Sequence, residues 1–344
     1  MVIETKLWRI TLDTNPEDCN LHCIMCEEHS HFSDFKQKLV EKTGIKRRLM
    51  PKEWIEQLFE EAKKLGVKEI IPSTMGEPLL YEHIDLFFEL AKKYDISINL
   101  TTNGTFPKKT LANWAKLIIP VTVDTKISIN GANSKTAENI MQGIDFEKQM
   151  QNIRKFVEFR NLHFIETGFY SRITFQLTFM RNNMHELTEI VKLAADLGID
   201  RIKGHHLWTH FDEIKHLSFE NSLESRKKWN EYVEIAHSAV QKYTKTNGAK
   251  ISLENFTPFD LEKKMTENKV PENLGCPFLE KELWISATGK ISPCCAPDIQ
   301  RNSLGNFGNY PETKLFNVLN SENYLHLVKN YKEFDLCKIC KMRR

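Results

Sequence analysis

The chain has 344 residues, enough for a large core and a smaller appended domain, and its hydrophobic content of 41% and charged content of 27% are ordinary for a globular protein. Its 48 basic and 46 acidic residues give a net charge of +2, which argues against a general nucleic-acid-binding surface. No segment is apolar for long enough to act as a signal peptide or to cross a membrane. With eight cysteines, this composition predicts a cytoplasmic protein whose thiols bind metal and do not form disulfides.

The first predicted strand, Trp8 to Leu12, leads directly into Cys19, Cys23 and Cys26, spaced C-x3-C-x2-C. Three thiolates at this spacing do not follow the paired C-x2-C plan of a tetrahedral zinc site. A four-iron cluster held by three thiolates keeps one iron open for a small ligand. We therefore predict an iron–sulfur cluster at the C-terminal end of a strand, where βα enzymes hold their active sites. Three core cysteines or a structural metal site are the alternatives.

A basic segment follows, Ser33 to Met50, and Pro51 then opens a helix at its first turn. The segment is longer than a connection between strand and helix requires, which predicts either a lid or a solvated flexible loop.

From this point helical and extended patterns alternate. Helices are predicted over Trp54–Leu65, Ile84–Tyr94, Leu111–Leu117, Phe146–Arg160 and Leu187–Leu197, and further strands over Glu69–Pro72, Ile96–Leu100, Pro120–Ser128, Arg172–Phe179 and Arg201–Leu207. Six strands with five intervening helices imply parallel pairing through right-handed crossovers, and hence an open barrel or a wound sheet.

The cysteine spacing after a first strand resembles the signature of the radical S-adenosylmethionine (SAM) superfamily, C-x3-C-x-Φ-C. Met25 stands at Φ, which is usually aromatic, and Met is apolar and adaptable. The resemblance implies an α/β fold with a partial (β/α)6 TIM-like barrel. It also implies that a [4Fe-4S] cluster on the three cysteines binds SAM, with Met25 beside the cofactor.

Two strand ends resemble further motifs of this family. Residues 73–78 are similar to its G-G-E-P turn, with Met75 in place of the first glycine. We expect Glu77 to accept a hydrogen bond from the ammonium group of SAM and Gly76 to let the backbone approach the ligand, with Pro78 completing the turn. Asn103 lies in Thr-Thr-Asn-Gly, which resembles the family's T-N-G turn and implies a contact with the cofactor.

Polar side chains near the ends of the fourth and fifth strands are further candidates for binding SAM or substrate. Ser128 and Asn130 face the expected barrel mouth, and Gln176 shares a face with Thr174 and Thr178 because alternate strand residues lie on one side. A polar interior filled with water is the alternative interpretation.

The sixth strand ends in Lys-Gly-His205-His206-Leu-Trp-Thr-His210. Histidines at a barrel mouth favour an acid–base or substrate role, and we take His205, His206 and Glu28 as candidate bases. The spacing does not indicate a mononuclear metal site.

A long helix is predicted over Ser222–Tyr243, and a second cysteine set follows a polar break. Cys276 and Cys294 flank a predicted hairpin at residues 284–292, in the pattern C-x12-G-x4-C, and Cys337 and Cys340 form a distal C-x2-C pair. By spacing alone, a zinc ribbon and an iron–sulfur cluster fit these four thiols equally well.

The same pattern resembles the twitch domain, a shortened relative of the SPASM domain found C-terminal to radical SAM barrels. The resemblance implies one auxiliary [4Fe-4S] cluster with all irons held by protein, and hence two clusters per chain. Cys295 is left over, and we expect it to point away from Cys294 and not to bind iron. The predicted organisation is a barrel over residues 1–215, a helical linker over 216–250 and a small α+β iron–sulfur domain over 251–344.

These inferences predict a radical SAM oxidoreductase that cleaves SAM to a 5′-deoxyadenosyl radical and uses an auxiliary cluster for net oxidation. Few residues precede the first strand, which leaves no room for a leader-peptide-binding domain and favours a small substrate such as an amino sugar or polyol. A ribosomally made peptide is the alternative substrate, and an RNA-modifying enzyme is disfavoured by the charge balance. The alternative of another class is a non-catalytic, metal-stabilised binding protein. The enzyme would need an electron donor such as flavodoxin or ferredoxin.

Overall fold

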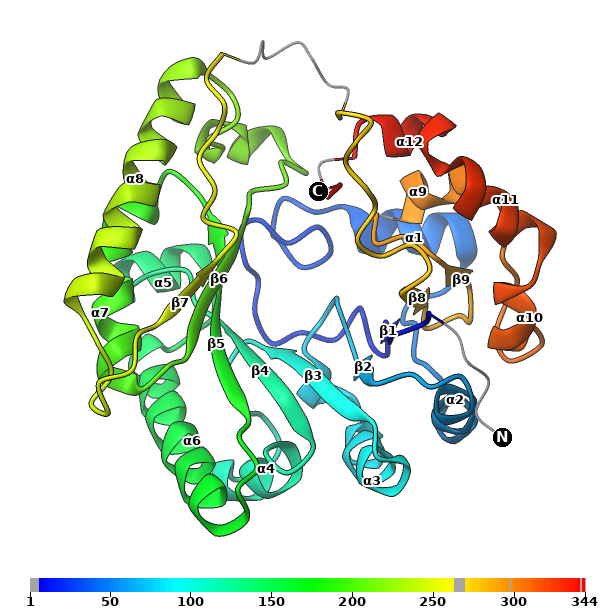
Figure 1. The fold of residues 1–344 in the computed structure, drawn as a ribbon, viewed down its shortest axis with the longest axis horizontal. Helices are drawn as coiled ribbons and strands as arrows, with labels where there is room; N and C mark the ends of the chain where they lie inside the picture. Colours follow the sequence, from blue (N-terminus) through cyan, green and yellow to red (C-terminus); the bar gives the residue numbers. More distant parts are fainter. Residues whose placement is uncertain (1–5, 263–269, 297, 341, 344) are drawn as a thin grey trace.

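The computed structural model describes residues 6–262, 270–296, 298–340 and 342–343. Its strands form one nine-stranded sheet in the order β7-β6-β5-β4-β3-β2-β1-β8-β9, curved into an open barrel with helices on its outer side (Figure 1). Within the described residues, only the β8–β9 pair of this sheet is antiparallel. The C-terminal ends of the barrel strands therefore lie at one edge of the sheet.

The barrel strands are β1 (Arg9–Leu12), β2 (Glu69–Ile71), β3 (Ser97–Thr102), β4 (Thr122–Ser128), β5 (Arg172–Phe179), β6 (Arg201–His206) and β7 (Ser252–Glu254), and the hairpin strands are β8 (Glu282–Ile285) and β9 (Ile291–Ser292). The α-helices are α1 (Phe35–Thr43), α2 (Lys52–Lys64), α3 (Ile84–Tyr94), α4 (Leu111–Ile118), α5 (Ser134–Ile140), α6 (Phe146–Thr167), α7 (Leu187–Leu197), α8 (Leu223–Lys242), α9 (Asp298–Arg301), α10 (Leu315–Leu319), α11 (Glu322–Asn330) and α12 (Asp335–Lys338).

The predicted partial (β/α)6 barrel is confirmed, since β1 to β6 pair in sequence order and in parallel. Most predicted elements lie within a few residues of the observed ones. Helix α5 was not predicted, and α6 runs on to Thr167. Trp8 precedes β1 and is 54% exposed, so it does not share the buried face of Ile10 and Leu12.

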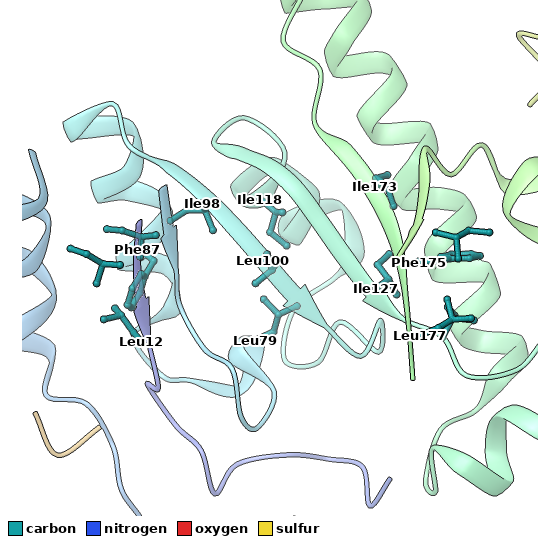
Figure 2. Close-up of a cluster of buried hydrophobic side chains, with 14 of the residues drawn as sticks. Leu12, Leu79, Phe87, Ile98, Leu100, Ile118, Ile127, Ile173, Phe175 and Leu177 are labelled. Carbon is teal, nitrogen blue, oxygen red and sulfur yellow. The ribbon is translucent and has the colours of Figure 1, made fainter. Parts of the chain in front are cut away.

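The hydrophobic core lies between the sheet and the outer helices. Side chains on the outward face of the strands pack there, while alternate residues point inward. Figure 2 shows part of this cluster, including Leu100 and Ile127 from the strands, Phe87 from α3 and Ile118 from α4. Each such side chain contributes about 1.5–3 kcal/mol by burial. This leaves the inward face of the barrel free to carry polar side chains.

The segment 33–50, for which a lid or a solvated flexible loop was predicted, is partly helical. It contains α1, which ends at Gly44 in a left-handed conformation and buries no residue. The end of the segment is fixed by ion pairs to the cysteine loop, since Arg47 contacts Asp18 at 2.7 Å and Arg48 pairs with Glu17. A helix anchored in this way keeps a fixed position over the loop.

The C-terminal hairpin belongs to the same sheet as the barrel. Strand β8 pairs in parallel with β1 along its whole length, from Arg9 opposite Glu282 to Leu12 opposite Ile285. Figure 1 shows the C-terminal helices, in orange and red, beside this edge of the barrel. At the other edge β7 pairs with β6, so strand pairing continues past residue 250. The predicted division of the chain into domains stays a prediction, and β7 favours a barrel that ends after this strand.

No helix in the described part of the chain is both long and apolar enough to span a bilayer.

Candidate active site and auxiliary cysteine site

The three N-terminal cysteines lie half-buried in the loop after β1. Backbone hydrogen bonds from His22 to Gln142 (2.8 Å) and from Ile24 to Ile140 (2.9 Å) fix this loop to the end of α5. Burial raises the pKa of the Cys19 thiol to about 11, and burial together with the charges of Cys26 and Cys19 raises the pKa of Cys23. Three thiolates this close together require a cationic partner, and the iron of a [4Fe-4S] cluster provides one.

No three His, Cys, Asp or Glu side chains of the described residues are placed so that they could hold a single metal ion. The thiols of Cys19, Cys23 and Cys26 nevertheless influence one another electrostatically. The choice of a four-iron cluster rests on the number and the spacing of these cysteines.

Gly76 packs against the cysteine loop, which differs from the role predicted for it. Its φ is +72°, and a Cβ added there would lie 2.5 Å from the carbonyl oxygen of Asn15 and 2.7 Å from that of Asp18. The next residue, Glu77, donates its backbone N–H to the same Asp18 carbonyl at 2.7 Å. Glycine is therefore required because two loops meet here, and an approach of this backbone to SAM stays a prediction.

Glu77 is buried, and its carboxylate already accepts hydrogen bonds from the protein. The donors are the Thr102 hydroxyl (2.7 Å) and the backbone N–H groups of Asn103 (2.8 Å) and Leu79 (3.3 Å). Burial raises the pKa of Glu77 to about 7. The carboxylate thus ties the turn after β2 to the end of β3, and Pro78, also buried, starts the 3-10 helix that follows. The predicted contact of Glu77 with the SAM ammonium stays a prediction.

Asn103 connects the end of β3 to the cysteine loop. Its side-chain N–H donates to Asn20 at 2.9 Å, and its side chain opposes the rise in the pKa of the Cys19 thiol. This places Asn103 next to the first predicted iron ligand. Met25 lies in the same region, where it packs with Leu21 and Ile140 in a small apolar cluster.

The inner face at the ends of β4, β5 and β6 brings together several predicted residues. Ser128 is in register with Gln176, and Gln176 Nε2 lies 3.3 Å from His205 Nδ1. Thr178 Oγ1 lies 3.5 Å from the other ring nitrogen of His205, and Asn130 Oδ1 accepts a hydrogen bond from Thr178 N at 2.9 Å. These contacts support the inward face predicted from alternation along β5.

His205 is a neutral imidazole whose basicity is lowered by its surroundings. Surrounding protein, and secondarily the positive charge of Lys203, lower the pKa of His205 to about 4, so the ring is neutral at pH 7. The side chain is nevertheless exposed. Both facts fit a ring that protein encloses on most sides and that remains open on one.

His206 points to the opposite face, and its prediction as a base is corrected. Its ring packs against Phe179, Trp229 of α8 and Phe259, with centroid separations of 5.5, 4.7 and 4.7 Å. Neighbouring residues of a strand lie on opposite faces, so only one of the two histidines can face the interior.

The third candidate base, Glu28, lies under the basic segment. Arg48 contacts its Oε1 at 3.2 Å, and Oε2 has no hydrogen-bond partner among the described residues. Burial raises the pKa of Glu28 to about 8, although Arg48 opposes the shift. A role for Glu28 as base stays a prediction.

Sequence reasoning missed a belt of charged side chains on the inner face of the barrel. Arg201 pairs with Asp124 and with Glu254 (2.5 Å), and Arg9 pairs with Glu69 (2.5 Å). Lys126 of β4 is the exception, since its ammonium donates to the Asn99 side chain and no carboxylate lies within ion-pair distance in the described part of the chain. Alternation along β4, which puts 124, 126 and 128 on one face, was the available signal.

The four distal cysteines also gather in one place. Burial and the charges of Cys294, Cys340 and Cys276 raise the pKa of Cys337 to about 12, which shows that all four thiols lie near one another. As at the first site, thiolates in this arrangement fit an iron–sulfur cluster, and the assignment of these four as its ligands stays a prediction.

The glycine of the C-x12-G-x4-C pattern has a steric role. Gly289 turns the chain between β8 and β9 with φ +87°, and a Cβ there would lie 2.2 Å from the Tyr310 carbonyl oxygen and 3.0 Å from the ring of Trp54 in α2. The hairpin that carries Cys294 is thereby seated on a helix of the barrel.

That Cys295 points away from Cys294 stays a prediction. The two thiols interact, and this interaction lowers the pKa of Cys294 and raises that of Cys295. That Cys295 does not bind iron stays a prediction.

Strand β8 connects the two cysteine sites. Glu282 accepts hydrogen bonds from Thr11 and from Arg9 (3.3 Å) on β1, the strand that leads into Cys19. The charge of Glu282 also contributes to the raised pKa of Cys295. A buried ion pair and a shared strand pairing therefore join the two sites.

These features define an iron–sulfur barrel enzyme, and comparison with known proteins identifies the family. The sequence model of the radical SAM superfamily matches residues 16–194, more than half of the chain, and that of the SPASM iron–sulfur cluster-binding domain matches residues 276–341. The chain belongs to the radical SAM superfamily, with a C-terminal twitch or SPASM-type domain. Its cofactors are [4Fe-4S] clusters and SAM.

Curated relatives match part of the chain. A probable GTP 3′,8-cyclase of Thermococcus kodakarensis is 25% identical over 185 residues, which cover 53% of this chain and 52% of that protein. The chain thus spans about half the length of the curated relatives it matches.

Solved structures match nearly the whole chain. Streptococcus suis SuiB bound to its precursor peptide SuiA has a TM-score of 0.66 at 19% identity and covers 97% of this chain and 71% of SuiB. The protein anSMEcpe with bound AdoMet and the Cp18Cys peptide has a TM-score of 0.66 at 15% identity and covers 98% of this chain and 89% of that one. Similarity at this identity shows that the fold is shared.

Proposed function

We propose that this protein is a radical SAM enzyme that modifies a peptide and that its auxiliary cluster accepts an electron from the substrate. The proposal of a peptide substrate rests on the fold that 97–98% of the chain shares with SuiB and anSMEcpe, whose structures contain peptides. The match includes the C-terminal domain as well as the barrel. This proposal replaces the amino sugar or polyol favoured by the sequence.

A nucleotide is the second candidate substrate. GTP 3′,8-cyclases are the curated relatives, but their similarity covers at most 53% of this chain. Because the matched part is confined to one portion of the chain, it supports the SAM chemistry more than the substrate.

When bound, the open cluster of this family supplies the electron that cleaves SAM and yields the radical that abstracts hydrogen from substrate. The chain's own residues hold and enclose these groups. Cys19, Cys23 and Cys26 hold the cluster, Asn103 orients the first of these thiols, and Ser128 and Gln176 offer hydrogen bonds on the inner face.

His205 is the residue we propose as base. It is neutral, its ring is held by Gln176 and Thr178, and one side remains exposed. A neutral imidazole in this position can accept the proton that a substrate radical loses on oxidation.

The auxiliary site is proposed to take the remaining electron. Net two-electron oxidation then consists of one hydrogen atom abstracted, one proton transferred to His205 and one electron passed to the auxiliary cluster. Cys276, Cys294, Cys337 and Cys340 would hold this cluster, and with four cysteine ligands it would have no open iron for substrate and would supply electron transfer. The electron that starts the reaction comes from a donor such as flavodoxin or ferredoxin.

The test is anaerobic reconstitution with SAM, a reductant and three substrate groups: peptides encoded next to the gene, GTP, and amino sugars. We expect 5′-deoxyadenosine together with a peptide that has lost two hydrogens, detected by mass spectrometry. Product formation from GTP or an amino sugar, and from none of the peptides, would refute the proposal of a peptide substrate.

One variant separates the cleavage of SAM from the oxidation of the substrate. Cys337→Ala should still form 5′-deoxyadenosine but should not complete oxidation. Normal product formation by folded Cys337→Ala that lacks only the auxiliary cluster would show that this cluster is structural.

A further inference from the structure

Arg343 is a buried arginine beside the auxiliary cysteines, with 6% of its surface exposed. Its guanidinium donates hydrogen bonds to the carbonyl oxygens of Leu274 (2.7 and 2.9 Å), Pro271 (3.1 Å) and Cys337 (3.2 Å). It therefore joins the segment that precedes Cys276 to the turn of α12 that carries Cys337.

All these acceptors are neutral. Among the residues that the structure describes, no carboxylate forms an ion pair with Arg343. Arg160, which is buried to a similar degree, also donates to backbone carbonyls but has Asp200 at 2.7 Å. Arginine stays protonated in proteins, and a buried charge without a counter-charge is strongly unfavourable. The described residues around Arg343 therefore supply no negative charge.

Among the described neighbours of Arg343, the groups that could carry a negative charge are the thiols of the auxiliary site. The ring of Tyr331 lies 5.9 Å from the Arg343 guanidinium carbon, and the Tyr331 hydroxyl accepts a hydrogen bond from the backbone of Cys276 at 3.4 Å. Arg343 thus contacts residues that hold both Cys276 and Cys337. A four-iron core held by four thiolates carries a net negative charge, and reduction adds one more.

We propose that Arg343 is the counter-charge of the auxiliary cluster and holds its reduction potential high enough to accept an electron. An adjacent fixed cation stabilises the reduced, more negative cluster more than the oxidised one, so it raises the potential. This inference rests on the auxiliary cluster of the proposed function and assigns to Arg343 a positioning role, since it acts through the cluster and does not touch substrate.

Arg301 offers an instructive contrast. It donates to the Cys294 carbonyl at 3.4 Å and lies 4.0 Å from Asp13. Its charge is therefore matched in part by a carboxylate of the barrel, whereas no carboxylate of the described residues pairs with Arg343.

The experiment uses the full chain with Cys19, Cys23 and Cys26 replaced by Ala, so that only the auxiliary cluster contributes to the spectrum. Arg343→Gln, Arg343→Lys and the control Arg160→Gln are made in this background and reconstituted anaerobically. Iron is counted, and the midpoint potential is measured by redox titration followed by electron paramagnetic resonance. No substrate is needed.

We expect Arg343→Gln to shift the midpoint to a more negative potential, Arg343→Lys to remain near the parent, and Arg160→Gln to leave the midpoint unchanged. Loss of iron in Arg343→Gln, with iron retained in Arg343→Lys, would equally support a requirement for the charge.

Three results would overturn the inference: an unchanged midpoint in loaded Arg343→Gln, an equal shift in Arg343→Lys, or loss of iron from both variants, which would make hydrogen-bond geometry the requirement. If the parent itself binds no iron, the auxiliary cluster and this inference fall together. If iron is retained but the midpoint does not respond, only this inference fails.

Discussion

Replacing Gly289 by Ala tests how the hairpin of the auxiliary site is seated on the barrel. An L-residue at φ +87° costs about 1–2 kcal/mol. The new Cβ would also lie 2.2 Å from the Tyr310 carbonyl, and such overpacking costs about 1–3 kcal/mol. Movement of Tyr310 would further weaken its 2.7 Å backbone hydrogen bond to Gly289, worth about 1 kcal/mol. We therefore expect a total destabilisation of about 3–6 kcal/mol.

Gly168→Ala is the matched control. Gly168 has φ +74° and no atom within 4 Å of the position its Cβ would take, so only the backbone strain of about 1–2 kcal/mol applies. Thermal unfolding of both variants without metal, followed by circular dichroism, gives the comparison, and a cost of 1 kcal/mol lowers Tm by about 2 °C in a chain of this size. Iron retained after reconstitution is the second readout. Equal losses in the two variants would refute the steric argument.

The remaining predictions concern the clusters and one buried charge. Cys23→Ala should abolish 5′-deoxyadenosine formation, because two thiolates do not hold the four-iron cluster, and persistent cleavage of SAM would contradict the assignment. Replacing Cys19, Cys23 and Cys26 together should leave about half of roughly eight irons, whereas Cys295→Ala should leave the iron count unchanged. Burial, with the charge of Lys203 adding to it, lowers the pKa of Lys126 to about 8 from 10.5. Between these two pH values the unfolded chain binds more protons than the folded one. The free energy of unfolding should therefore rise from pH 8 to 10 by on the order of 1–3 kcal/mol relative to that of Lys126→Met. If the difference between the two proteins does not change with pH, Lys126 is not desolvated.

Much of the fold could be predicted from the sequence because local patterns and pairing rules agree. Apolar alternation located the six barrel strands, and the helical periodicity between them required parallel crossovers. Cys19, Cys23 and Cys26 follow the first strand, and the edge at which they lie is fixed by that topology. The chemistry of the site could be predicted because three thiolates at this spacing suit few groups other than an iron–sulfur cluster.

Long-range packing decided what the sequence could not show. That Gly76 must be glycine to fit against the Asn15 and Asp18 carbonyls could not be predicted, because these residues are far away in sequence. His205 and His206 are adjacent residues of the same type, so the sequence alone does not show which ring points inward. The register of β6 places the His205 ring inward and packs the His206 ring on Trp229. Nor could the spacing of cysteines reveal that the thiols of Cys294 and Cys295 interact.

The pairing of β8 with β1 has the largest functional consequence among the features that local sequence cannot predict. It places the hairpin of the auxiliary site beside the strand that carries the first cluster loop, and Arg9 and Thr11 hold Glu282 of that hairpin from the barrel side. A separately folded domain on a linker could vary its distance from the barrel, whereas nine strands in one sheet cannot do so without breaking strand pairing. The shared sheet therefore holds the two cysteine sites at a constant separation. A purely structural metal site would not require this attachment to β1.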